Sequence, residues 1–394
     1  MTTVGLVSSA RSDVSFYLPL MRALEAHPAF ELRVIATGMH LVREFGLTVR
    51  QIEDAGFRVH ERVESLAGTD SPEGVASSMG RGVTEFSRLF ARWRPDLLLV
   101  FGDRFDMFPA ALAALPFRIP VAHIAGVDIT EGAMDDALRH ALTKLSHLHF
   151  VSLEAHRERI VRMGEEPWRV VVCGSLALDT LKNLTLWTPA ETAERFHLDL
   201  TRPAALVTYH TVTLEYEQTG TQITNLLTAL DEAGVQCLFT YPNADMGYRQ
   251  VIRAIERFCD GRADRRVIVN AGQVEYFSLL QTVSVMVGNS SSGLVEAPSF
   301  KLPVVNIGAR QAGRIRVANV ISCGDGVEDV AEALRRALSP EFRATLHDLR
   351  NPYGDGHAAE RLVERLAVLC HRSGLLHKKF MDGVARVALE EAVR

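Results

Sequence analysis

Short runs of β-branched and leucine residues alternate with longer amphipathic stretches along most of the chain. In the first half these runs are typical of buried strands, and they lie at residues 4–9, 31–37, 96–102, 119–126, 148–152 and 168–174. Helical patterns lie between them, for example at 16–27 and 82–93. Continuous apolar runs indicate strands that are covered on both faces. The alternation therefore predicts a parallel sheet with right-handed crossovers.

The alternation pauses at residues 178–190 and then begins again. Further apolar runs predict the strands of a second sheet, at 204–210, 235–243, 265–270, 283–289 and 302–308. We therefore predict two α/β domains, at 1–180 and 181–356, with helices at 357–394 that join the first domain. In open α/β sheets ligands bind beyond the carboxyl ends of the strands, so polar segments at strand ends are the first candidates for a site.

Composition and charge narrow the class of protein. The 394 residues fit two domains, and 47% hydrophobic with 23% charged residues excludes disorder as the overall state. A net charge of −5 argues against a nucleic-acid binder that works by bulk charge. Five scattered cysteines without a CxxC pair predict neither a disulfide framework nor a metal site. No GxGxxG or Walker pattern occurs, so the common dinucleotide and NTP fingerprints are absent.

The sequence also lacks the usual targeting and membrane signals. The N-terminal residues show no charged segment followed by an apolar stretch, as a signal peptide would. The longest run without charge, residues 276–295, contains three consecutive serines and is too polar for a membrane span. We therefore expect a cytoplasmic protein with no membrane partner.

Ionisable residues follow the strands of the first domain. Arg11 and Ser15 lie between the first strand and a helix, where they suit an anionic group or simply cap the helix. Asp103 and Arg104 follow the strand at 96–102, where they face a ligand or pair with each other. Both interpretations stay open at this point.

The segment 123–150 is dense in ionisable groups. Carboxylates gather before or at the start of its predicted helix, namely Asp128, Glu131, Asp135 and Asp136. The helix dipole alone explains some of them, and the i,i+4 spacing of Asp135 with Arg139 favours an ordinary ion-pair face. Acid–base chemistry needs only two carboxylates on opposite sides of a substrate, so Asp103 with Asp128 or Asp135 is the functional alternative.

In the second domain, polar residues again end the strands. His210 lies in the first strand–helix turn, as a ligand group or a capping histidine. The segment 287–300 places three serines and a glycine between a strand and a helix, where backbone N–H groups can approach a phosphate, and Glu296 can accept from ribose hydroxyls. Arg310 and two further arginines follow the next strand, as diphosphate partners or as a solvated basic face.

Taken together and in this order, these segments resemble the hydrolysing UDP-N-acetylglucosamine 2-epimerases of sialic-acid and related nonulosonic-acid pathways. The resemblance rests on RSDVS (11–15), GMHLVREFG (38–46), GDRFD (102–106), TEGAMDDALRHALTKLSHLHF (130–150), YHTVTLE (209–215), YPNADMG (241–247), EYFSLL (275–280), GNSSSG (288–293) and ARQAGRIR (309–316). It implies two Rossmann-like domains in the glycosyltransferase-B arrangement with an inter-domain cleft, in a homodimer or homotetramer. It also implies anti elimination of UDP to a 2-acetamidoglucal and then addition of water, without a metal or cofactor.

By position, the resemblance assigns the nucleotide to the second domain. It implies that Phe277 and Ser278 border the uracil, that Asn243 lies along the nucleotide, and that Glu296 contacts the ribose. The diphosphate would meet further residues from both domains, which are Arg11, Ser15, His210, Ser290, Ser291, Ser292 and Arg310.

The sugar is assigned to the first domain in the same way. The resemblance implies that Asp103, Asp135 and His40 face the sugar and that Arg104 positions the substrate. Asp103 and Asp135 are the leading candidates for proton transfer. Asp128 joins them because it takes the place of a glutamate in the family pattern.

The sequence departs from the family on the sugar side. Many relatives have His-Ile-Glu-Gly-Gly-Glu or His-Ile-His-Gly-Gly-Glu where this chain has HIAGVD, so Ala125 replaces a Glu or His tied to catalysis and Val127 replaces a glycine. Asp128, with its shorter arm, is a candidate to replace the lost group. Thr211 and Ala309 depart in the second domain, where proline and Asp or Thr are common.

Three hypotheses for function follow. The first is a hydrolysing nucleotide-sugar 2-epimerase acting on UDP-N-acetylglucosamine or a modified relative such as UDP-diacetylbacillosamine. The second is a family member that carries out elimination or epimerisation on another nucleotide-sugar or nucleoside. The third is a nucleotide-sugar-binding protein without catalysis, for which loss of Asp103 or Asp135 would also be expected.

Overall fold

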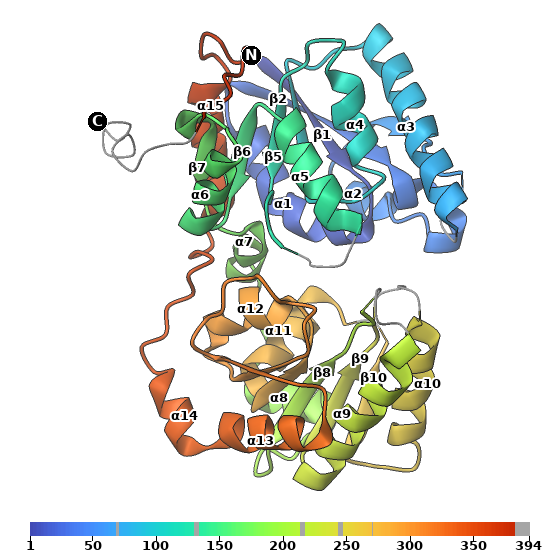
Figure 1. Cartoon of the computed structure of the whole chain (residues 1–394), viewed down its shortest axis with the longest axis vertical. Coiled ribbons are helices and arrows are strands. Elements are labelled where there is room, and N and C mark those ends of the chain that lie inside the picture. The colour runs from blue at the N-terminus through green and yellow to red at the C-terminus, as the bar shows by residue number, and fades with distance from the viewer. Residues whose placement is uncertain (68–70, 130–133, 213–216, 243–246, 270, 383–394) are drawn as a thin grey trace. The chain divides into compact units, whose positions relative to one another are not determined.

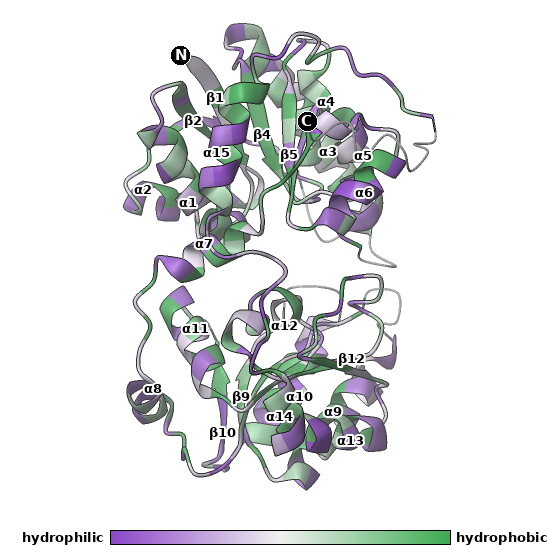
Figure 2. Cartoon of the chain, turned by 90° about the vertical axis from the view of Figure 1, so that its left-hand side faces the viewer, coloured by the Kyte–Doolittle hydropathy of each residue, from purple (hydrophilic) through white to green (hydrophobic). Residues whose placement is uncertain are grey.

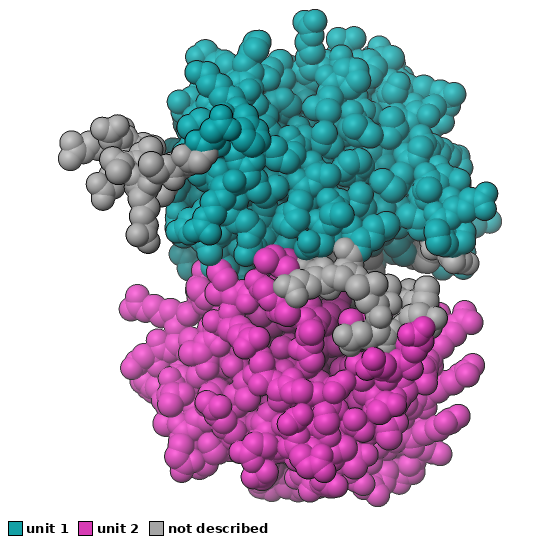
Figure 3. Space-filling view, viewed as in Figure 1, with its two compact units in different colours: residues 1–128, 134–182, 353–394 teal, residues 129–133, 183–352 magenta. Residues whose placement is uncertain are grey.

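The structure is a computed structural model that describes residues 1–67, 71–129, 134–212, 217–242, 247–269 and 271–382, without the side chains of Arg11, Ser12, Ser15 and Phe45. The chain divides into two compact units, which Figure 3 shows in different colours. Unit 1 holds Met1–Asp128, Met134–Lys182 and the chain from Tyr353 on, and unit 2 holds most of the remainder, Asn183–Pro352. The division after Lys182 lies two residues beyond the predicted boundary at 180.

The sheet of unit 1 is parallel throughout, with the order β3-β2-β1-β4-β5-β6-β7. Its strands are β1 Thr2–Ser8, β2 Phe30–Thr37, β3 Val59–Val63, β4 Leu97–Phe101, β5 Val121–Ile124, β6 Leu148–Val151 and β7 Val170–Val172. This is the 3-2-1-4-5-6 order of a Rossmann fold, extended by one strand. The edge strand β3 was not predicted.

Helices cover both faces of this sheet (Figure 1). They are α1 Arg11–Ala26, α2 Arg50–Asp54, α3 Pro72–Arg92, α4 Phe108–Ala114, α5 Met134–Leu145, α6 Glu154–Arg162, α7 Leu176–Lys182 and α15 Ala358–Leu369, with the short 3₁₀ helices η1 Gly38–Leu41, η2 Arg43–Phe45 and η3 Pro167–Arg169. The strands alternate their side chains between two cores. Along β4, Leu97 and Leu99 pack under α1 and α15, whereas Leu98 and Val100 pack under α3 and α4. Burial on both faces explains why β4 is a continuous apolar run.

Unit 2 repeats the same architecture with a six-stranded parallel sheet in the order β10-β9-β8-β11-β12-β13. Its strands are β8 Ala204–Thr208, β9 Gln236–Thr240, β10 Arg265–Ile268, β11 Val285–Gly288, β12 Val304–Ile307 and β13 Val320–Cys323. Its helices are α8 Pro189–Phe196, α9 Thr219–Ala233, α10 Tyr248–Cys259, α11 Gln273–Thr282, α12 Ser292–Val295, α13 Val327–Leu338 and α14 Pro340–Thr345, with the 3₁₀ helix η5 Ala297–Phe300. Figure 2 shows hydrophobic strands inside each unit and hydrophilic residues on the outer helices.

Both units are thus Rossmann-like, as predicted. In each sheet the strand order reverses at one place, between β1 and β4 in unit 1 and between β8 and β11 in unit 2. Ligands of such sheets bind beyond the carboxyl ends of the strands at the place where the order reverses. The glycosyltransferase-B arrangement and the cleft expected with it stay predictions.

Buried polar contacts fix the last helix and the tail on unit 1. The Asp179 carboxylate in α7 accepts hydrogen bonds from the backbone N–H groups of Ala358 and Ala359, at 2.9 and 2.7 Å, and so caps α15. The fully buried Arg169 guanidinium donates to the carbonyls of Gly374, Leu375 and His377, as well as to that of His147. One side chain therefore connects the end of η3 to the tail that follows α15.

Replacement of Arg169 by leucine is expected to lower the free energy of unfolding by about 3–5 kcal/mol. The substitution leaves four carbonyls without this donor and the Glu166 carboxylate without its partner at 2.7 Å. Chemical denaturation of both proteins measures the difference.

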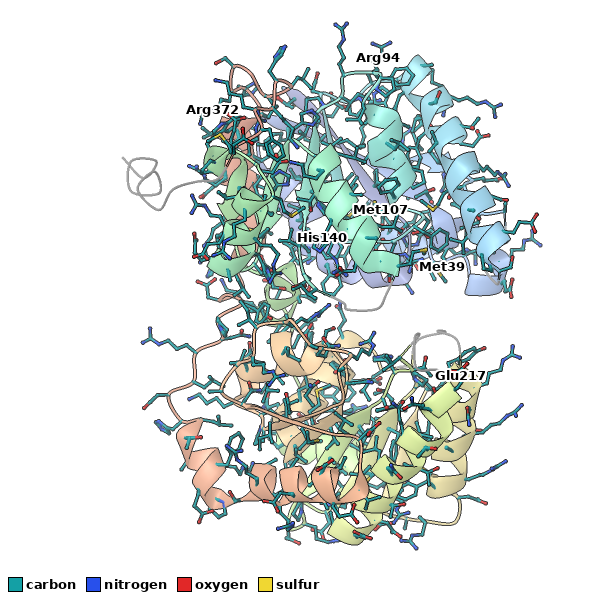
Figure 4. All side chains as sticks on the ribbon, viewed as in Figure 1. Met39, Arg94, Met107, His140, Glu217 and Arg372 are labelled. Carbon is teal, nitrogen blue, oxygen red and sulfur yellow. The ribbon has the colours of Figure 1, made fainter. Side chains whose placement is uncertain are left out.

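Arg372→Ala is the matched control, because Arg372, which Figure 4 labels, is exposed. It stacks on the same Trp168 ring that Arg169 contacts. Its loss should change stability by about 1 kcal/mol or less. Equal effects of the two substitutions would show that Arg169 does not anchor the tail.

Candidate functional site

The loop between β1 and α1 lies at the carboxyl edge of the unit 1 sheet, where the strand order reverses. The buried Asp13 carboxylate accepts hydrogen bonds from the Ser9 and Ala10 backbone N–H groups, at 2.8 and 3.1 Å, and from the Ser9 hydroxyl at 3.0 Å. Burial raises the pKa of Asp13 above its ordinary value. Arg11 and Ser15 lie in this helix, but their side chains lie outside the described residues. Their contact with a diphosphate stays a prediction.

His40 lies next to this loop in η1 and is fully buried. Its Nε2 lies 2.9 Å from the Ser8 hydroxyl and its Nδ1 lies 2.8 Å from the Thr48 hydroxyl. Burial lowers the pKa of His40 to about 4, so the ring is neutral near pH 7. Both ring nitrogens are engaged by the protein, so the predicted contact with a sugar has to be made by another edge of the ring or after a rearrangement.

The ion pairs after β4 differ from the pairing that was considered from sequence. Arg104 donates from Nε and Nη2 to the two oxygens of buried Asp106, both at 3.0 Å, rather than to its neighbour Asp103. Its Nη2 also contacts the sulfur of Met39, a residue labelled in Figure 4. This bidentate pair fixes the plane of the guanidinium.

Asp103 is held instead by Arg139 of α5. The Arg139 Nε donates to Asp103 Oδ2 at 2.8 Å, and its Nη2 donates to the same oxygen. Its Nη1 donates to the backbone carbonyl of Asp128 and lies 3.3 Å from Asp136 Oδ1. The Arg139 side chain is only 4% exposed, whereas that of Asp103 is 23% exposed. A buried cation thus connects the end of β4 with the turn after β5.

Sequence reasoning assigned Arg139 to an ordinary ion-pair face and missed this role. The signal was present as a cation near the acidic start of the helix, but its partner Asp103 lies 36 residues earlier. Asp135 and Asp136 do lie in the first turn of α5, where the helix dipole favours negative charge. Asp135 is also close enough to Arg104 to help raise the pKa of that arginine.

The turn after β5 has an unusual backbone. Ala125 has φ +58° and Val127 has φ +62°, in the left-handed region that glycine adopts freely and β-branched residues avoid. The Val127 side chain is nevertheless fully buried against Val151, Ile160 and their neighbours. Residues in this conformation persist only where surrounding contacts determine it. The turn presents Asp128, whose side chain is 27% exposed.

In unit 2, one asparagine joins the loops that follow β8 and β11. The Asn289 side chain accepts from the His210 backbone N–H at 2.7 Å and donates to the His210 carbonyl at 2.8 Å. The Asn289 carbonyl in turn accepts from Arg310 Nη1 at 3.0 Å and from the Gln311 amide at 2.8 Å. Burial, with a smaller effect of Arg310, lowers the pKa of His210 to about 3. His210 and Arg310 are therefore both hydrogen-bonded to Asn289 at the carboxyl edge of this sheet.

The serine-rich segment begins directly after β11. Gly288 has φ +131°, and a Cβ there would lie 1.9 Å from the Thr208 carbonyl oxygen, so only glycine fits. Ser290 and Ser291 follow, and Ser292 accepts a hydrogen bond from the Tyr276 hydroxyl at 2.8 Å.

Glu296 lies beneath this segment with one carboxylate oxygen buried and without a hydrogen-bond partner among the described residues. Burial raises the pKa of Glu296, and a hydrogen bond with Ser292 opposes that shift. A buried oxygen that lacks a donor can accept a hydrogen bond from a ligand hydroxyl.

The other residues that were predicted to contact the nucleotide are Phe277, Ser278 and Asn243. Phe277 is buried and stacks on Phe300, with ring centroids 6.3 Å apart. The Ser278 hydroxyl accepts from the Trp187 backbone N–H at 3.0 Å and is fully buried. Asn243 lies outside the described residues. Their contacts with a nucleotide stay predictions.

The described residues contain neither a candidate metal site nor a candidate membrane-spanning helix. No group of three His, Cys, Asp or Glu residues there is placed to hold a metal ion. Within the same ranges, no helix has the length and hydrophobicity needed to cross a membrane. All five cysteines are free thiols.

The β5 turn leads to a prediction on stability. An alanine at Gly126 would place its Cβ 2.8 Å from His123 Nδ1 and 2.9 Å from Thr143 Oγ1. His123 cannot move away easily, because it is buried and its Nε2 lies 2.7 Å from the Gly102 carbonyl. Gly126→Ala should therefore destabilise the protein by about 1–3 kcal/mol in chemical denaturation.

Gly80→Ala is its control, because Gly80 is exposed in α3 with no atom near the added methyl. This change should stabilise the protein by about 0.5–1 kcal/mol. A neutral Gly126→Ala variant would contradict the described packing of the turn.

The sequence is similar to those of a known family and of two named relatives. The family described as UDP-N-acetylglucosamine 2-epimerase matches residues 22–367. The chain is 34% identical to a Campylobacter jejuni protein named GDP/UDP-N,N'-diacetylbacillosamine 2-epimerase (hydrolyzing), over 96% of this chain and 98% of that protein. It is 32% identical to the Legionella pneumophila UDP-N,N'-diacetylbacillosamine 2-epimerase (hydrolyzing), over 94% of this chain and 97% of that protein.

The fold is also similar to solved structures. One is the crystal structure of UDP-GlcNAc 2-epimerase from Neisseria meningitidis bound to UDP-GlcNAc, with a TM-score of 0.80 at 20% identity. The alignment covers 92% of this chain and 99% of that one. The family match spans most of the chain and agrees with full-length relatives above 30% identity. The chain therefore belongs to the UDP-N-acetylglucosamine 2-epimerase family.

Proposed function

We propose that this chain is a hydrolysing nucleotide-sugar 2-epimerase, which converts a UDP-linked 2-acetamido sugar and water into UDP and the free 2-epimeric sugar. Family membership and similarity along nearly the whole length of two hydrolysing 2-epimerases support this assignment. The observation that carries it is the buried Arg139, which connects Asp103 with the turn of Asp128 at the carboxyl edge of a Rossmann sheet. Two partly exposed carboxylates at that edge are suited to proton transfer.

The proposed reaction has two halves and no net change of oxidation state. A base removes the proton at C2, the electron pair forms the C1=C2 bond, and the C1–O bond breaks so that its pair leaves with UDP. Water then adds its oxygen to C1 of the 2-acetamidoglucal. A proton adds to C2 on the face opposite to the one from which the first proton was removed, which inverts C2. The first half requires a proton acceptor near C2 and stabilisation of the charge on the leaving diphosphate, and the second half requires a proton donor near C2 and an acceptor for the proton that the water loses.

Unit 1 supplies the groups for the sugar in this proposal. Asp103, Asp128 and Asp135 are the candidates for proton transfer, because each lies at the carboxyl edge of the sheet or in the first turn of α5. Arg104 positions the substrate, since its guanidinium is already fixed in a plane by Asp106. Neutral His40 stays assigned to the sugar side.

Unit 2 supplies the groups for UDP. Arg310 and the Ser290–Ser292 hydroxyls are proposed to bind the diphosphate, because a guanidinium and hydroxyl donors that follow neighbouring strands of one sheet suit an anion. The buried Glu296 oxygen is proposed to accept from the ribose hydroxyls. A cation at the leaving diphosphate stabilises the charge that develops when the C1–O bond breaks.

UDP-N,N'-diacetylbacillosamine is the substrate that we favour. Two full-length relatives at 34% and 32% identity are named for that sugar. The change from Glu or His to Ala125 and from glycine to Val127 also lies on the sugar side, where a different substituent would be recognised. UDP-N-acetylglucosamine is the second candidate, because a protein of the same fold binds it. A homodimer or homotetramer in the cytoplasm stays part of the proposal.

A direct test compares UDP release from the two UDP-sugars by the purified chain. The diacetylated sugar is expected to give at least about a tenfold higher kcat/KM. Asp103→Asn should lower kcat by about 10²–10⁴ because a proton-transfer group is lost, while UDP affinity measured by calorimetry stays unchanged.

Asp54→Asn is the control, because it removes an exposed carboxylate of α2 outside the site. An Asp103→Asn variant with near-normal turnover would remove Asp103 from the mechanism. UDP binding without turnover of either sugar would contradict the enzyme and favour a binding protein.

A further inference from the structure

Helix α6 holds the strained turn after β5 by several contacts. Ile160 and Val161 of α6 pack on the buried side chain of Val127. Arg159, on the same helix, donates from Nη1 to the Val127 carbonyl. The next carbonyl, that of Asp128, accepts from Arg139 of α5. Two arginines and an apolar cluster therefore determine the backbone at Val127 and Asp128.

His156 adds a contact of a different kind, one helical turn before Arg159. Its Nε2 lies 3.2 Å from Asp128 Oδ1, which is within hydrogen-bond distance. The His156 side chain is 6% exposed, whereas that of Asp128 is 27% exposed. A buried imidazole thus approaches one oxygen of a carboxylate that is itself partly exposed.

These contacts leave little freedom to Asp128. Because the backbone is fixed at the turn, only the side-chain torsions of Asp128 can move its carboxylate. A donor at Oδ1 restricts those torsions and so fixes the direction of the whole carboxylate. A supporting residue raises the reaction rate by holding an acid–base group in one position. A displacement of that group by about 1 Å lowers the rate on the order of 10²-fold.

We propose that His156 is a positioning residue for Asp128, which holds that carboxylate in place for proton transfer to or from the sugar. This role rests on the proposed function, and it adds to that function the residue that holds one acid–base candidate, Asp128. It also gives a physical reason why Asp128 can act in a chain with alanine at 125. A hydrogen bond donated by Nε2 is the property that His156 contributes.

Two substitutions separate this role from simple packing. His156→Gln keeps an N–H donor near the place of Nε2, whereas His156→Leu keeps a similar volume without a donor. The measurements are kcat and KM for UDP release, UDP affinity by calorimetry, and thermal unfolding. Glu158→Gln serves as the control on α6, because Glu158 is exposed.

The proposal predicts that His156→Leu lowers kcat by about 10- to 100-fold, with KM and UDP affinity within about threefold of the unmodified protein. His156→Gln should restore kcat to within about threefold of that protein. Equal losses in folded Gln and Leu variants would overturn the proposal, as would an unchanged kcat in the Leu variant. If the Leu variant does not fold, a Gln variant with more than a tenfold loss of kcat overturns it.

The proposed function fails in a different way. If the unmodified chain binds UDP but releases none from either UDP-sugar, the enzyme assignment is wrong before any variant is compared. If it turns over and the variants all match it, the assignment stands and the role of His156 is wrong.

Discussion

The buried guanidinium of Arg139 is the interaction on which the candidate site of unit 1 depends. An arginine that is 4% exposed requires compensation for its charge, and Asp103, Asp136 and the Asp128 carbonyl supply it. These partners come from the end of β4, the first turn of α5 and the turn after β5. The position of each element is therefore tied to the others, and loss of one partner would leave a buried charge that costs about 3–5 kcal/mol.

The same constraint explains how the turn tolerates residues that disfavour its conformation. Val127 at φ +62° carries a strain of about 1–3 kcal/mol. Burial of its side chain offsets a similar amount, and Arg159 and Arg139 hold the consecutive carbonyls of Val127 and Asp128. A glycine in this place would adopt the conformation freely but would leave a void in the cluster of Val151 and Ile160. The departure from the family pattern is thus accommodated by packing.

The sequence was sufficient for the fold because most strands are buried on both faces and show as continuous apolar runs. The strands that escaped prediction, β3 and β13, lie at sheet edges and carry polar, partly exposed residues. The same limit applies to the site. Motifs placed Asp103, His210 and Ser290 at strand ends, but the partners of Arg139 and His156 lie 36 and 28 residues away and show no spacing signal. Positive φ at Val127 also leaves no mark in the sequence, because β-branched residues rarely adopt it.

The account as a whole depends on epimerisation through a glycal, in which C2 loses its proton and later receives one from solvent. Incubation of the protein with UDP-N,N'-diacetylbacillosamine in D₂O, followed by proton NMR, observes that step directly. We expect UDP together with a free sugar that has inverted configuration and deuterium at C2. Release of UDP with a sugar that keeps its original proton and configuration at C2 would contradict the account, because it would show hydrolysis without elimination.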